Sequence, residues 1–203
     1  MEESIPFGSR TYFLLLLVLL FSRGADFLST WVATPNMVLE GNPIAKKLGW
    51  RWGIPINLLL CILFAAWPLP AIVISTTSVL VAARNFQAAW LMRSMGEQQY
   101  REWHVARVQE TNVTLYLACL FGQAALFAAL GLAVICLTFW EKQTALLAIG
   151  LGIVAYAIAV VIYTLIGICR LRRSFLPVQP VSASMQPSEV QEGYPRQEAR
   201  PEV

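Results

Sequence analysis

Charged residues are scarce in this chain, and the spacings typical of catalytic and metal sites are missing. Charged residues occupy 13% of the 203 positions, about half the share found in an ordinary soluble domain. The formal net charge of +3 is too small to indicate a nucleic-acid partner. His104 is the only histidine and no two cysteines form a C-x-x-C pair, so we expect no metal site, no disulfide framework and no cofactor.

Apolar residues are abundant instead. They make up 57% of the chain, and several nearly uncharged runs reach the ~18 residues needed to cross ~30 Å of hydrocarbon. The sequence therefore predicts an all-α fold, a polytopic transmembrane helical bundle over residues 1–173. The five expected spans are 11–35, 52–67, 71–92, 113–139 and 144–169.

The number of spans depends on the segment Trp67-Pro68-Leu69-Pro70. One long helix across these prolines would give four spans, but proline removes a backbone donor and clashes inside a helix, which favours a turn. Five spans also gather nine basic residues on one side and leave two on the other. The nine are Lys46, Lys47, Arg51, Arg93, Arg101, Arg107, Arg170, Arg172 and Arg173, and the two are Arg10 and Lys142.

Cytoplasmic loops carry the excess of lysine and arginine in membrane proteins. We therefore expect the N-terminus outside and the C-terminus inside a cytoplasmic membrane, in a bacterium. On the inner side, residues 94–112 form either a short amphipathic helix at the membrane surface or a solvated extension of the third span. Residues 174–203, rich in proline, serine, glutamine and glutamate, are expected to form a disordered cytoplasmic tail.

The most informative polar residue is Asp26, which lies inside the first expected span. Ionisable residues within a span are rare, usually face the bundle interior and are functional candidates. Asp26 and Arg84 each lie nine residues from the inner end of their helix, roughly 13 Å deep at 1.5 Å per residue. Because pairing lowers the cost of a buried charge, we expect Asp26 to contact Arg84, Arg23 or both. The candidate polar cluster is Asp26, Thr30, Glu40, Asn42, Asn57, Arg84 and Asn85.

The segment Glu40-Gly41-Asn42-Pro43 follows the first expected span. A residue before proline favours an extended backbone, and proline is favoured at the first position of a helix. Glu40 and Asn42 can then point back toward Thr30 and Asp26. The alternative is an ordinary surface turn with solvated side chains.

The pattern D-x-x-x-T at Asp26 and Thr30, followed by E-x-N-P at Glu40, Asn42 and Pro43, resembles a signature shared by small prokaryotic integral membrane proteins of unknown function. The resemblance covers roughly residues 11–92. This chain departs from the pattern by two further helices and its tail. The resemblance implies a membrane location and marks these five positions, but it implies no activity.

Three functions are compatible with these observations. The first is a structural or accessory helical bundle in which the polar cluster holds helices together. The second is a binder or carrier of a lipid or small solute that uses the same cluster. An intramembrane enzyme is the third and least favoured, because the acid–base pair it needs has no supporting motif. Membrane lipid and a second copy of the chain are the expected partners.

Overall fold

The computed structural model describes residues 4–40, 42–141 and 143–174. This part of the chain contains helices and no strand, which confirms the all-α class. The helices, in chain order, are α1 (Arg10–Ala33), α2 (Pro43–Phe64), α3 (Pro68–Met95), α4 (Glu97–Glu110), α5 (Val113–Glu141) and α6 (Thr144–Ser174). The tail predicted for residues 174–203 lies outside the described residues, apart from Ser174 at the end of α6.

Within the described residues, five helices are long and apolar enough to cross a membrane, which confirms the predicted number of spans. The prolines at positions 68 and 70 do separate two helices. Pro68 is the first residue of α3, and the chain turns between Phe64 and Pro68. The four-span alternative is therefore wrong. At this turn the Tyr12 hydroxyl donates to the Ile62 carbonyl over 3.0 Å and ties α1 to the end of α2.

The second span differs most from its prediction, because α2 begins at Pro43 rather than at residue 52. Asn42 is extended, with φ −78° and ψ 113°, and its side chain accepts hydrogen bonds from the first turn of the helix. Helical structure then continues across a kink at Gly49, whose φ of 61° suits glycine. The helix therefore starts where local capping permits, outside the most apolar part of the segment.

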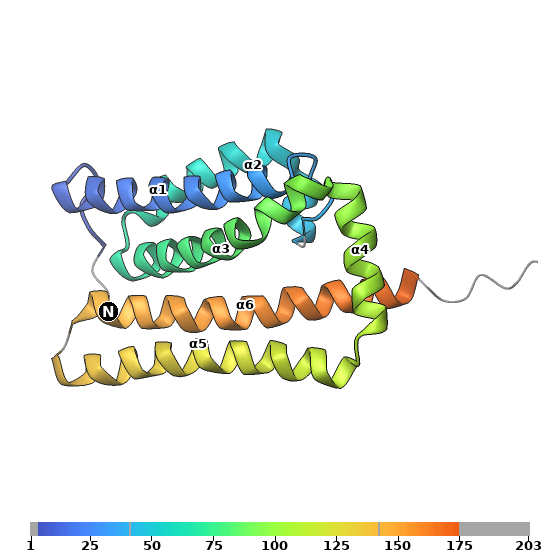
Figure 1. Ribbon diagram of the computed structural model, residues 1–203. Coiled ribbons are helices and arrows are strands. Elements are labelled where there is room, and N and C mark those ends of the chain that lie inside the picture. Colours follow the sequence, from blue (N-terminus) through green and yellow to red (C-terminus); the bar gives the residue numbers. More distant parts are fainter. Residues whose placement is uncertain (1–3, 41, 142, 175–203) are drawn as a thin grey trace, which may run out of the picture.

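The long helices stand side by side, with α3 near the middle of the arrangement (Figure 1). One side of α3 packs against α1 and another packs against α6, and α5 lies beyond α6. In contrast, α2 runs alongside α1 and makes far fewer contacts with its neighbours than α1 makes with α3. The position of α2 thus depends on a small number of interactions.

Glycines allow the closest helix approaches. A Cβ atom at Gly131 would lie 2.8 Å from the Gly150 carbonyl oxygen, so α5 and α6 pack almost backbone to backbone. A Cβ at Gly152 would lie 2.7 Å from the Thr76 side chain, which shows the same closeness between α6 and α3. Two other glycines of these helices have open space where a Cβ atom would lie: Gly122 and Gly167.

The connector forms a helix of its own. Gly96, with φ 81°, ends α3, and α4 then crosses the end of the bundle toward α5 (Figure 1). The extension of the third span is therefore wrong. The helix also lacks the single apolar face of the amphipathic alternative, and none of its residues is fully buried. The Tyr100 and His104 rings stack on each other with centroids 5.9 Å apart.

One end of the bundle carries α4, the last turns of α1, α3 and α6, and the first turns of α2 and α5 (Figure 1). Every one of the nine basic residues grouped by the sequence pattern lies on an element at this end, which we call the basic end. The start of α1 and the turn between α2 and α3 lie at the opposite end (Figure 1).

Candidate polar site between the first three helices

Arg23 on α1 lies at the centre of the polar site. Its Nη1 donates to Asp26 Oδ2 over 2.9 Å and to Ser78 Oγ over 3.1 Å. Its Nε donates to Asn57 Oδ1 over 3.0 Å, and Nη2 donates to the same oxygen. We call Arg23, Asp26, Asn57 and Ser78 the Arg23 network. One guanidinium therefore joins α1 to both α2 and α3.

Local structure places each member of the Arg23 network. Arg23 and Asp26 are three residues apart on α1 and so share a helical face. Asn57 on α2 is oriented by its own Nδ2, which donates to the Gly53 carbonyl over 2.8 Å. Ser78 belongs to a stripe of small buried residues on α3 that lets α1 approach closely. The stripe consists of Ala71, Ser75, Ser78, Ala82 and Ala89.

A second polar tie lies about two helical turns from Arg23, closer to the basic end. Asn85 on α3 donates through Nδ2 to Ser29 Oγ and to Thr30 Oγ1, each over 3.2 Å. Ser29 donates in turn to the Asp26 carbonyl over 2.8 Å. Thr30 and Asn85, both predicted members of the cluster, therefore meet directly across the boundary between α1 and α3.

The predicted contact of Asp26 is made with Arg23 and not with Arg84. In the described part of the chain no hydrogen bond or ion pair joins Arg84 to Asp26. The position of a residue along a helix does not determine the side of the helix on which it lies. At 3.6 residues per turn, Arg84 is rotated by about 200° from Ala82 and about 100° from Asn85, the residues that face α1. Arg84 therefore stands outside the site.

Glu40 and Asn42 form their hydrogen bonds within their own turn and not with Asp26. Asn42 Oδ1 accepts from the backbone N–H of Ile44 over 3.0 Å, and Glu40 Oε1 accepts from the Asn42 N–H over 2.7 Å. No hydrogen bond connects either side chain to Thr30 or Asp26 among the described residues. The hydrogen bonds of both side chains are local instead: Asn42 caps α2, and Glu40 binds the N–H of that cap residue. Glu40 still lies within electrostatic range of Asp26.

Glu97 is a polar residue that the sequence analysis missed. Its Oε2 accepts from Thr34 Oγ1 over 2.9 Å and from the Val38 N–H over 3.1 Å. Its Oε1 accepts from Asn36 through the backbone N–H over 2.9 Å and through Nδ2 over 3.2 Å. We call Glu97, Thr34, Asn36 and Val38 the Glu97 clamp. It fastens the first residue of α4 to the loop between α1 and α2.

Hydrogen bonds and burial shift the pKa values of two residues of α4. Partial burial alone would raise the pKa of Glu97, but the hydrogen bonds from Asn36, Thr34 and Val38 outweigh it and lower that pKa. Burial lowers the pKa of His104, since it disfavours the charged imidazolium. These shifts favour the carboxylate form of Glu97 and the neutral form of His104 in the folded protein.

The loop that the clamp grips is fastened from α2 as well. Trp50 Nε1 donates to the Pro35 carbonyl over 2.9 Å, and Lys46 Nζ donates to the Val38 carbonyl over 3.4 Å. Within the loop, Met37 adopts a φ of 55°, which is uncommon for a residue other than glycine. These contacts explain how an irregular segment holds one shape at the basic end.

The polar side chains of this site connect helices to one another. In residues 4–40, 42–141 and 143–174 no group of three or more histidine, cysteine or acidic residues is placed to hold a metal ion. The polar atoms of the Arg23 network bond to one another across helix boundaries, as buried polar groups in membranes must. Outside the network, Ser75 Oγ on α3 is a buried oxygen without a hydrogen-bond partner in this part of the chain.

Comparison with protein-family models, with curated proteins and with solved structures gave no match to this chain. The resemblance based on Asp26, Thr30, Glu40, Asn42 and Pro43 thus stays a prediction. What the fold itself defines is a class: an all-helical bundle whose long apolar helices fit a membrane location.

Proposed function

We propose that this chain is a structural or accessory integral membrane protein whose polar site fixes the arrangement of its first three helices. The observation that carries the proposal is the Arg23 guanidinium, which bonds to side chains from α1, α2 and α3. Its donors are used within the protein, as expected of a residue that connects helices.

The energetics of membrane helices support this role. An unpaired charge at this depth costs on the order of 3 kcal/mol on insertion scales, so the ion pair between Arg23 and Asp26 removes a large penalty. Hydrogen bonds between membrane helices contribute roughly 0.6–2 kcal/mol each. For α2, which has few packing contacts, bonds of this size make up a substantial part of its attachment.

The proposed orientation is N-terminus outside and C-terminus inside a bacterial cytoplasmic membrane. Its support is the basic end, which gathers nine lysines and arginines and leaves Arg10 and Lys142 for the other side by sequence. In this orientation the Glu97 clamp and α4 face the cytoplasm.

The second candidate is a binder or carrier of a lipid or small solute at the same site. The observation in its favour is accessibility, since the Arg23 and Asp26 side chains remain 28% and 18% exposed. A ligand with a charged group could reach this ion pair from the side of the bundle. This role predicts that the acid affects ligand affinity more than stability.

A double-mutant cycle separates the two candidates. The variants are Arg23→Gln, Asp26→Asn and the combination, with Arg84→Gln as a control that removes the same charge from α3 outside the site. Thermal unfolding in lipid nanodiscs gives the stability of each. In the structural role, both single changes destabilise by about 1–3 kcal/mol and the double change costs less than their sum. A neutral or stabilising Asp26→Asn would reject that role and favour the binder.

A further inference from the structure

The exposed surface of α6 is hollowed by a continuous groove that the polar site does not use. An open hollow of about 480 Å³ lies over the middle of the helix, and a second open hollow of about 320 Å³ lies closer to the basic end. The first is lined by Ala155, Ile158, Ala159, Ile162, Tyr163 and Ile166, and the second by Leu165, Ile166, Cys169 and Arg170. Because both include Ile166, we treat them as one feature, the α6 groove.

Side-chain size explains the hollow. Ala155 and Ala159 are four residues apart and lie on one helical face, where bulkier neighbours stand on either side of them. From Ala155 to Arg170 the groove extends about 22 Å at 1.5 Å per residue. Half of a ~30 Å hydrocarbon core is ~15 Å, so the groove matches the depth of one leaflet together with its headgroup layer.

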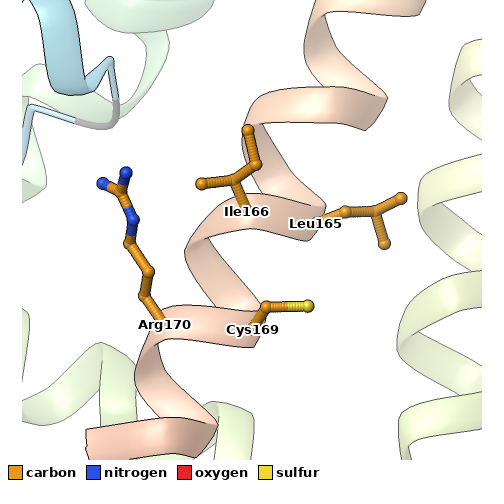
Figure 2. Close-up of a pocket in the computed structure, with 4 residues that line it drawn as sticks. All are labelled: Leu165, Ile166, Cys169 and Arg170. Carbon is orange, nitrogen blue, oxygen red and sulfur yellow. The ribbon is translucent and has the colours of Figure 1, made fainter.

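The groove changes character at its end. Its lining is almost entirely apolar until Arg170, which is also the last residue of the apolar span in α6. Figure 2 shows Ile166 and Arg170 on one side of α6, while Leu165 and Cys169 extend from the other side. The apolar part of the α6 groove thus ends at the guanidinium of Arg170, at the level expected for lipid headgroups.

The apolar part of the α6 groove and the arginine at its end together indicate which kind of ligand would bind. An arginine binds phosphate oxygens through paired N–H donors, and its five donors allow Arg170 to do so while keeping its interaction within the chain. Arg172 and Arg173 follow within three residues in the sequence. Basic clusters at the cytoplasmic end of a membrane helix attract anionic lipids.

We propose that the α6 groove is a binding site for one anionic phospholipid. An acyl chain lies over Ala155 and Ala159, and the phosphate group contacts Arg170. The site is separate from the Arg23 network, which lies between α1, α2 and α3.

The test is native mass spectrometry of the full chain, purified in detergent and titrated with phosphatidylglycerol or with phosphatidylcholine. We expect one phosphatidylglycerol to bind about tenfold more tightly than phosphatidylcholine, the ratio that one charge-assisted contact supplies. Arg170→Gln should abolish this preference, whereas Arg170→Lys should keep part of it. Ala159→Trp fills the hollow and should weaken binding of both lipids.

Two matched controls accompany these variants. Arg101→Gln removes a charge from α4 at the same end, and Ala125→Trp places the same bulk on the exposed surface of α5. Both should bind phosphatidylglycerol as the unmodified chain does. The proposal is overturned if Arg170→Gln keeps the lipid preference, if Ala159→Trp binds normally, or if the controls lose as much affinity. Helical content by circular dichroism identifies any variant that fails to fold, and Arg170→Lys then supplies the deciding comparison.

Discussion

Replacing Glu97 with glutamine should loosen the loop between α1 and α2. Glutamine keeps one carbonyl oxygen for the two donors of Asn36 but places an NH₂ group where Oε2 accepts from Thr34 and Val38. Two hydrogen bonds to a charged acceptor are lost, each worth about 1.5–3 kcal/mol when well buried. Because the site is only partly buried, solvent screening reduces the sum, and we expect a loss of about 1–3 kcal/mol.

The assay combines thermal unfolding in nanodiscs with limited trypsin digestion. Lys46 and Lys47 lie on the α2 turn that the loop precedes, so a looser loop should speed cleavage there. The matched control is Glu110→Gln, which breaks the exposed ion pair with Arg107 near the other end of α4 and should have little effect. The reasoning is refuted if Glu97→Gln is as stable and as resistant to trypsin as this control.

The same residue predicts a pH dependence with a definite sign. The pKa of Glu97 in the folded protein is lower than its ordinary value of 4.5, so the folded state favours the carboxylate. The stabilisation is complete above that ordinary value and is lost as the pH falls through the lower folded pKa. Unfolding curves between pH 7 and pH 3 should show this loss in the unmodified chain. The part due to Glu97 should be absent from Glu97→Gln.

Two further predictions concern packing and the opposite end of the bundle. Gly150→Leu forces a side chain into the Gly131 backbone and should separate α5 from α6, whereas Gly122→Leu, in open space, should not; the helix spacing is measurable by cross-linking of paired cysteines. Tyr12→Phe removes the hydroxyl that donates to Ile62 and should destabilise by about 1 kcal/mol in thermal unfolding. An unchanged melting curve for Tyr12→Phe would show that this bond contributes nothing to holding α2.

The features predictable from sequence were those that depend on local chemistry. Two prolines spaced by one residue ended one helix and began the next, and Asn42 before Pro43 gave an extended cap. The ion pair of Asp26 with Arg23 followed from a spacing of three residues on one helix. In each case the interactions among a few residues close in sequence are sufficient to produce the structural feature.

Features that depend on rotation and long-range contact were not predictable. Arg84 was selected by its position along the third span but lies on another face of α3, because the stripe of small residues is what packs against α1. The Glu97 clamp joins residues about 60 positions apart in sequence, and an acid after a glycine at a helix start carries no sign of such a partner. Only the crossing of α4 over the end of the bundle brings them together.

Polar contacts matter most for α2, the long helix that makes few packing contacts. In a bilayer, lipid tails replace apolar side chains at little cost, so hydrophobic contact alone does not decide which helices associate. The α3, α5 and α6 helices are held together by close backbone packing at Gly131, Gly150 and Gly152. The α2 helix lacks such packing and is held by the bonds of Asn57 and Trp50 instead. Removing those bonds should therefore release α2 before any other helix, an order that hydrogen exchange of the Arg23→Gln variant would reveal.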